Sequence, residues 1–180
     1  MPFKGLFWKT QEVSNELKVH VYPTPLPLNP FLGVHFTVTV DGHLKIGPTA
    51  IPCFWKEQYN GLQRFSIFEF QNILINQFSL LLLGDKGIFR KIAFQEFPKY
   101  SQKYVQKLAS KLVTGLDMKI FNSRYAPGIR AHLFNKKNFE LVNDFVIEHD
   151  AHSLHILNAV SPAFTCSIAL SNFIVSKYLI

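Results

Sequence analysis

Arg130 is the residue of this sequence best suited to holding an anion. It follows Pro127–Gly128 in a stretch, 129–134, whose residues favour a β-strand. A planar guanidinium presents paired N–H donors that match the two oxygens of a carboxylate, so Arg130 is a candidate substrate-binding residue. An arginine on a strand is, by residue type alone, more often a surface or salt-bridge residue, and that alternative stays open.

Two histidines extend this possible site. His35 lies in a run of apolar and β-branched residues, and its imidazole is a candidate catalytic base that takes a proton from a hydroxyl group. The alternative is a hydrogen-bonded histidine of the core. His132 follows Arg130 by two residues, so a strand would place both on one face, and His132 is a second candidate for substrate binding.

The first third of the chain has the pattern of strands. Two short strands are predicted near Phe7 and over 19–22, with a polar turn at 14–16 between them. Prolines then exclude a helix between 23 and 30 and lead into a third strand over 31–40. Asp41–Gly42 is a tight turn, so 31–47 is predicted to form a β-hairpin.

Helices are predicted in the middle of the chain and strands after it. Apolar residues repeat at helical spacing over 66–82, Gly84 and Gly87 follow as stop signals, and further helices are expected over 88–94 and 100–111. Strands are expected over 129–134, 141–148 and 154–157. A last helix should begin at Ser161–Pro162, with Ser161 as N-cap, and run to about Tyr178. This order indicates an α+β fold with a mixed, largely antiparallel sheet and a helical layer.

The charge of the chain suits an anionic partner without identifying it. The formal net charge is +7, and Lys99, Lys103, Lys107 and Lys111 are spaced to form one stripe on a helix. No interleaved arginines and aromatic residues accompany the stripe, so we interpret it as a solvated helix face. A nucleic-acid partner is therefore not expected, whereas a carboxylate substrate is compatible with the charge.

Several other classes of protein are disfavoured. Cys53 and Cys166 are too few and too far apart for a disulfide framework or a zinc cluster, which fits a reducing cytoplasm, and no metal site is expected. No signal peptide is apparent, and polar residues interrupt the apolar stretch 65–83, so it is not a membrane span. The nine glycines include no pair separated by one residue, as a dinucleotide-binding turn requires.

Several blocks of the sequence closely resemble the substrate domain of L-2-hydroxyglutarate oxidases and dehydrogenases, which are FAD enzymes of the D-amino-acid-oxidase-like superfamily. The blocks occur in the family's order: 2–5 (PFKG), 30–37 (PFLGVHFT), 41–42 (DG), 47–50 (GPTA), 127–131 (PGIRA) and 158–163 (NAVSPA). They span nearly the whole chain, with the helical middle matching weakly. The chain departs from the family at Thr49, where the family has Asn, and at 54–59 (FWKEQY).

The resemblance implies a longer enzyme in which a Rossmann-like FAD domain comes first. Residues 1–150 would then be part of the substrate domain, and 151–180 a strand and helix that complete the FAD domain. The chain is accordingly expected to be truncated or one product of a split gene, to bind no FAD alone, and to be inactive without an FAD-binding half, which a separately encoded partner would supply. A cytoplasmic location is expected, with peripheral attachment to the inner membrane left open.

The resemblance also implies roles for particular residues. Arg130 would hold the carboxylate of a dicarboxylic 2-hydroxy acid, and His35 would take the hydroxyl proton while the hydride leaves for the flavin. The family usually has Gln at the position of His132. Lys4 and Tyr22 are weaker candidates for the second carboxylate, with surface or packing roles as the alternative. The cofactor-binding candidates lie before the last helix, whose N-terminus would face the flavin: Asn158, Ala159, Ser161, Pro162 and Ala163.

A second function class is compatible with the same residues. The chain could be a non-catalytic relic, or an anion-binding interaction module that kept the fold and lost the chemistry. The upstream reading frame would distinguish these, because a frame encoding an FAD domain supports the enzyme.

Overall fold

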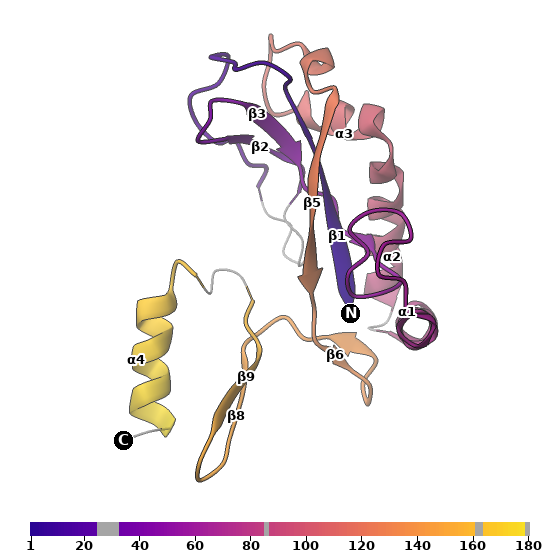
Figure 1. The fold of residues 1–180 in the computed structure, drawn as a ribbon, viewed down its shortest axis with the longest axis vertical. Helices are drawn as coiled ribbons and strands as arrows, with labels where there is room; N and C mark the ends of the chain where they lie inside the picture. Colours follow the sequence, from indigo (N-terminus) through magenta and orange to yellow (C-terminus); the bar gives the residue numbers. More distant parts are fainter. Residues whose placement is uncertain (25–32, 85–86, 161–163, 179–180) are drawn as a thin grey trace.

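The computed structural model describes residues 1–24, 33–84, 87–160 and 164–178, which form strands and helices in alternating groups (Figure 1). The first group is β1 (Pro2–Lys9), β2 (His35–Val38), β3 (Leu44–Gly47) and β4 (Ile51–Pro52). The helical group is α1 (Ile67–Leu83), α2 (Ile88–Glu96), η2 (Phe97–Tyr100), α3 (Gln102–Ala109) and η3 (Met118–Ile120). The last group is β5 (Ser123–Ala131), β6 (Phe134–Asn135), β7 (Glu140–Leu141), β8 (Val146–His149), β9 (Leu154–Asn158) and α4 (Ser167–Tyr178).

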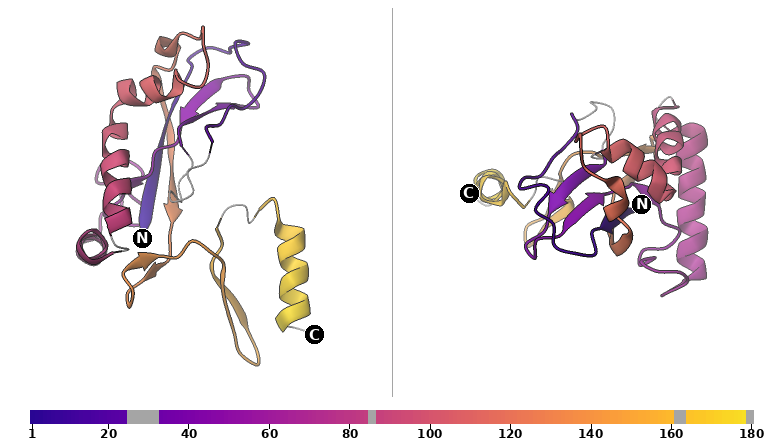
Figure 2. Two further views of the ribbon diagram at one scale, coloured as in Figure 1. Left: turned by 180° about the vertical axis from the view of Figure 1, so that it is seen from behind. Right: turned by 90° about the horizontal axis from the view of Figure 1, so that it is seen from above.

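β1 is the central strand of a five-stranded antiparallel sheet. One edge of β1 pairs with β5 along its whole length, and the other pairs with β4 near its start and β3 near its end. β2 continues the sheet beyond β3. α1, α2 and α3 lie on one side of the sheet, and α4 stands on the other side (Figures 1 and 2). The predicted α+β class with a largely antiparallel sheet and a helical layer is confirmed.

Two apolar clusters join the sheet to the helices. Trp8, Phe36, Leu44 and Ile46 pack against Val105 and Ala109 of α3. Near the other end of β1, residues from β1, the segment before β4, α1 and α2 form the second cluster: Phe3, Ala50, Leu80, Phe89 and Ile92. Side chains alternate along a strand, so the residues adjacent to Trp8, Phe36, Leu44 and Ile46 point the other way. They lie on the sheet face that α3 does not cover, which we call the uncovered face.

The hairpin prediction is confirmed by the pairing of β2 with β3, in which His35 lies opposite Gly47 and Val38 opposite Leu44. β2 is shorter than the strand expected over 31–40, of which 31–32 lie outside the described residues. Ser66 caps α1 by accepting a hydrogen bond from the Glu69 amide, and Gly84 follows its last turn as predicted.

The expected strand over 19–22 is wrong. Among the described residues of 19–22, Val21 bridges Phe36 through two backbone hydrogen bonds, and the next amide on this edge of β2, that of Val38, donates to the His20 side chain instead of to a backbone carbonyl.

The strands after the helices differ from the prediction. β5 begins at Ser123 and continues through Pro127, whereas the strand was expected only from residue 129. The β1–β5 register shifts between Gly5 and Phe7, so β5 carries an extra residue in a bulge next to Pro127. Proline is tolerated there because a bulge on an edge strand requires no donor from it. The single strand expected over 141–148 is divided into β7 and β8.

The last helix begins later than predicted, at Ser167, since 164–166 form a turn. The capping residues expected for it, Ser161 and Pro162, lie outside the described residues. The proposed domain boundary after residue 150 falls in the turn between β8 and β9, where the Asp150 amide donates to the Ser153 carbonyl. Within the described part of the chain, no helix is both long enough and apolar enough to span a membrane.

The lysine stripe is only partly solvated, so the interpretation of it as one solvated face is wrong for its first member. Lys103, Lys107 and Lys111 are exposed, but Lys99 is only 8% exposed. Its ammonium donates to Glu96, which is 3% exposed, and the other oxygen of this carboxylate accepts the Ala50 amide at 3.0 Å. Lys99 is buried because it belongs to η2, which packs against β4. Lys103 and Lys107 belong to the next helix, α3, and Lys111 follows the end of α3.

Candidate functional site

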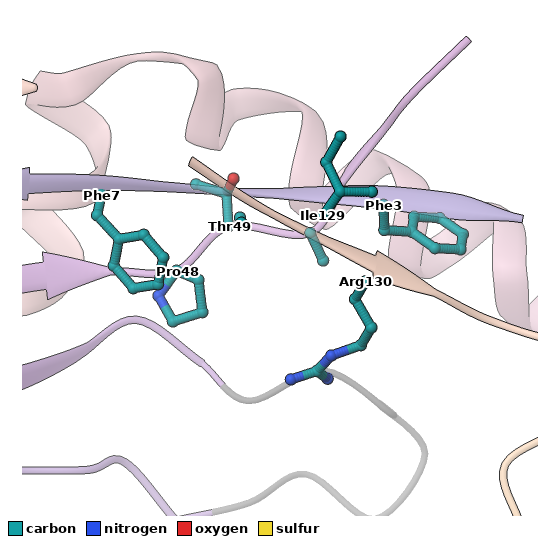
Figure 3. A pocket seen from close by; sticks show the side chains of 9 residues that line it. Phe3, Phe7, Pro48, Thr49, Ile129 and Arg130 are labelled. Atoms are coloured by element: carbon teal, nitrogen blue, oxygen red, sulfur yellow. The ribbon is translucent and has the colours of Figure 1, made fainter. Parts of the chain in front are cut away.

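A cavity of about 240 Å³ lies over the pairing of β1 with β5. Its walls come from β1, β5 and the segment between β3 and β4: Phe3, Gly5, Phe7, Pro48, Thr49, Ala50, Gly128, Ile129 and Arg130 (Figure 3). Gly5 and Gly128 are directly opposite each other in the register. Two paired residues without side chains leave the hollow open at this point of the sheet.

Hydrogen bonds hold the wall opposite β5 in place. The Thr49 hydroxyl accepts the Leu6 amide at 3.1 Å and donates to the Lys4 carbonyl at 3.2 Å. The next residue, Ala50, donates its amide to the buried Glu96 carboxylate. A side chain at Gly5 would meet Pro48 at 2.9 Å, so this close approach requires glycine. The cavity is therefore built on rigid elements.

Arg130 lies opposite Phe3 in the β1–β5 register and lines the cavity. Figure 3 shows its side chain leaving β5 on the side opposite to that of Ile129. Arg130 is exposed, and none of the ion pairs found among the described residues includes it. A free guanidinium at the rim of a hollow is suited to binding a carboxylate from solution.

His35 shares the uncovered face of the sheet but does not line the cavity. It is 8% exposed and pairs with Gly47, the residue that precedes the wall residue Pro48 in the sequence. Its Nδ1 is 3.0 Å from the Gly33 carbonyl oxygen. Because a carbonyl only accepts, Nδ1 must carry the proton, and Nε2 keeps its lone pair. Burial lowers the pKa of His35, and the charges of Lys45 and His20 lower it further, while the bond to Gly33 opposes the shift.

The Tyr22 ring covers His35, with ring centroids 4.3 Å apart and planes tilted by 34°. Tyr22 is half exposed. The structure thus brings these two predicted residues together, and it places Tyr22 against the imidazole rather than in the wall that carries Arg130.

His132 is buried beside Phe3, with ring centroids 5.6 Å apart and planes nearly perpendicular. It follows the end of β5, and its amide donates to the Met1 carbonyl. Burial and, secondarily, the charge of Arg130 lower the pKa of His132 to about 4. It does not line the cavity, so its placement favours a packing role next to Arg130.

This pKa predicts a stability that depends on pH. The folded-state pKa of about 4 lies below the unfolded value of about 6.5, so the unfolded chain takes up the proton first as pH falls. The contribution is complete above pH 6.5 and is lost on acidification toward pH 4. Between pH 7 and pH 5, the free energy of unfolding of the wild type should therefore fall by about 2 kcal/mol more than that of His132→Gln. Urea unfolding at both pH values measures this, and His152→Gln at an exposed site should keep the wild-type difference.

Lys4 lies on the opposite face of the sheet from Arg130. It pairs with Ile129, the residue that points away from Arg130, and it lines a different groove, where its ammonium is 3.4 Å from the Tyr59 carbonyl oxygen. The structure therefore does not bring Lys4 and Arg130 to one site.

The predicted cofactor-binding residues that can be placed are Asn158 and Ala159. Asn158 is buried at the end of β9, and its amide nitrogen donates to the carbonyls of Val142 and Asp144 at 2.9 and 2.7 Å. The side chain thus ties the end of β9 to the segment 142–144. Both N–H groups of its amide are used in these bonds, so neither is available to a flavin. Ala159 is exposed, and Ser161, Pro162 and Ala163 lie outside the described residues.

The described part of the C-terminal segment lacks the features of a dinucleotide site. β9 pairs antiparallel with β8, and the residues between β9 and α4 include no glycine that would let a backbone approach a pyrophosphate. The described residues consequently do not fit a dinucleotide site by themselves.

Lys45 is a residue of this face that the sequence analysis missed. It is half-buried on β3, and its ammonium lies 4.5 Å from the ring centroid of the wall residue Phe7 and 5.0 Å from that of Tyr125. Burial lowers its pKa. It pairs with no acidic residue among the described ion pairs. The alternation of Lys45 with buried Leu44 and Ile46 was the available signal, since it places Lys45 on the uncovered face.

Curated proteins similar to this chain are L-2-hydroxyglutarate dehydrogenases. The mitochondrial enzyme of Nematostella vectensis is 31% identical, that of Homo sapiens 30%, and the enzyme of Escherichia coli strain K12 29%, each over 98% of this chain. The chain spans 38 to 41% of the length of these relatives. No family model matches it. The partial resemblance found in the sequence is confirmed by these matches.

Proposed function

We propose that this chain provides the substrate-binding part of an FAD-dependent oxidoreductase that converts L-2-hydroxyglutarate to 2-oxoglutarate. The observation that carries the proposal is the Arg130 guanidinium at a cavity floored by Gly5 and Gly128, in a chain similar to L-2-hydroxyglutarate dehydrogenases. The cavity is large enough for one carboxylate and its neighbouring carbons, with the rest of the substrate in the open rim.

Two cations account for the two carboxylates of the substrate. Arg130 binds the carboxylate next to the hydroxyl-bearing carbon through its paired donors. The Lys45 ammonium lies over Phe7, which is four residues along β1 from Phe3, the partner of Arg130. Phe3 and Phe7 are therefore roughly 13 Å apart along the strand, and the Arg130 side chain and a five-carbon dicarboxylate together can span this distance.

His35 accounts for the proton of the substrate hydroxyl. Its Nδ1 is fixed as a donor to Gly33, and the lowered pKa keeps the imidazole neutral near pH 7, so Nε2 can accept a proton. The reaction also requires an acceptor for the hydride of the same carbon. The family resemblance implies FAD for this role, and the described residues do not form its site.

In this proposal residues 1–150 belong to the substrate domain and 151–180 contribute to an FAD domain. α4 and β9 expose apolar side chains that such a domain would cover, among them Ile156, Ile168 and Phe173. The partner would be an FAD-binding half on a separate chain. Co-expression with the part of the Escherichia coli relative outside the matched region tests this. Formation of 2-oxoglutarate supports the proposal, and a soluble complex that binds L-2-hydroxyglutarate without oxidising it supports the anion-binding module instead.

Lys45→Met should weaken binding of L-2-hydroxyglutarate by about tenfold, or about 1.4 kcal/mol, because the variant keeps the aliphatic stem and loses one hydrogen-bonded charge contact at a half-buried position. L-2-hydroxybutyrate, which lacks the second carboxylate, should bind the variant and the wild type equally. Isothermal titration of both ligands measures the difference. An equal loss for both ligands would contradict a specific contact with the second carboxylate.

A further inference from the structure

A second and larger hollow, of about 420 Å³, lies on the other face of the β1–β5 pair. We call it the outer groove. β1, β5, η2 and the loop after β4 line it, and Phe7 is the only lining residue that it shares with the Arg130 cavity among the described residues. Its volume is within the range of small-molecule sites.

The charged residues that line the outer groove are both positive. Lys4 and Trp8 are four residues apart on β1, so their side chains point to the same face, and Arg124 is opposite Trp8 in the register. Lys4 and Arg124 therefore both lie on the face of the outer groove. No acidic residue lines the groove, and neither cation belongs to an ion pair found in the described part of the chain. Four residues of β1 separate the positions, roughly 13 Å of strand.

Aromatic side chains form the walls between these two cations. Tyr59 and Tyr100 line the groove and are each nearly half exposed, and Phe54 lies beside them. Tyr125 borders the groove, but it is opposite Phe7 in the register and its ring lies 5.0 Å from the Lys45 ammonium, on the other face of the sheet. Burial, and secondarily the nearby Cys53, raises the pKa of Tyr100, so its phenol remains a hydrogen-bond donor. Partly exposed rings beside unpaired cations form a surface that suits a flat ring carrying negative charge.

We infer that the outer groove is a second ligand site, which binds a planar aromatic molecule with acidic groups at opposite ends. One acidic group binds Lys4, the other binds Arg124, and the ring lies against Tyr59 and Tyr100. The site uses residues that the proposed oxidation of 2-hydroxyglutarate does not use.

The probe for this site is 2,6-naphthalenedicarboxylate, titrated calorimetrically into the full chain. Lys4→Gln and Arg124→Gln should each weaken its binding at least tenfold, and the neutral 2,6-naphthalenedimethanol should bind at least tenfold more weakly than the dicarboxylate. Lys103→Gln, at an exposed lysine of α3 outside the groove, is the matched control and should leave the affinity unchanged. Circular dichroism confirms that each variant is folded.

A second arm separates this site from the Arg130 cavity. Arg130→Lys and saturating L-2-hydroxyglutarate should both leave the affinity for the dicarboxylate unchanged, whether or not the chain takes part in oxidation. The inference is overturned if no binding is measurable at millimolar probe, if the neutral diol binds as well as the dicarboxylate, or if Arg130→Lys abolishes binding.

Discussion

In the enzyme rebuilt with an FAD-binding half, which would cover the exposed Arg130 guanidinium, replacing Arg130 with lysine should weaken L-2-hydroxyglutarate binding by about 2 to 5 kcal/mol, comparable to truncating one partner of a buried charge pair. Lysine keeps the positive charge but loses the planar fork, so only a single donor direction faces the carboxylate. In the enzyme rebuilt with an FAD-binding half, kcat/KM should fall by a similar free energy while the amount of bound flavin stays the same.

The matched control is Arg90→Lys, at an exposed arginine of α2 outside the cavity lining. Its effect on binding should stay within about 0.5 kcal/mol. Titration calorimetry and steady-state kinetics on both variants measure the difference. If Arg130→Lys behaves like Arg90→Lys at equal flavin occupancy, Arg130 does not bind the substrate.

Lys99→Met should lower the free energy of unfolding by about 3 to 5 kcal/mol, because it leaves the Glu96 carboxylate buried without its cation. The cost arises from an uncompensated charge rather than from lost packing, since methionine fills much of the same volume. Urea unfolding followed by circular dichroism at pH 7 measures the loss.

Two further variants identify the cause. Lys103→Met removes an exposed lysine of the same stripe and should change stability by less than about 0.5 kcal/mol. In the double variant Glu96→Gln with Lys99→Met, the glutamine carbonyl oxygen can still accept the Ala50 amide, and no buried charge remains. The double variant should be more stable than Lys99→Met alone. Equal instability of the two would show that packing of the Lys99 stem, not the charge, determines the effect.

The sequence alone determined the elements whose signals are local. The β2–β3 hairpin follows from β-branched residues on both sides of Asp41–Gly42, and α1 follows from apolar spacing between Ser66 and Gly84. Arg130 became a candidate from the sequence by the type of its side chain and by the resemblance of 127–131 to a known family, and the structure places it in the lining of a cavity. In each case the deciding residues are close together along the chain.

Tertiary structure decided everything that depends on a partner distant in sequence. Lys99 and Lys103 are equivalent in a helical pattern, but only Lys99 meets the packed strand region and a buried Glu96 carboxylate that also binds Ala50. Lys4 and Arg130 were expected at one site, but the pairing of Lys4 with Ile129 places them on opposite faces of the sheet. Strand register is set by contacts between segments more than a hundred residues apart, and a shift of one residue reverses the face of every side chain. For that reason the sequence could propose Arg130 as a candidate, whereas the separation of Lys4 from Arg130 and the presence of Lys45 on the Arg130 face required the fold.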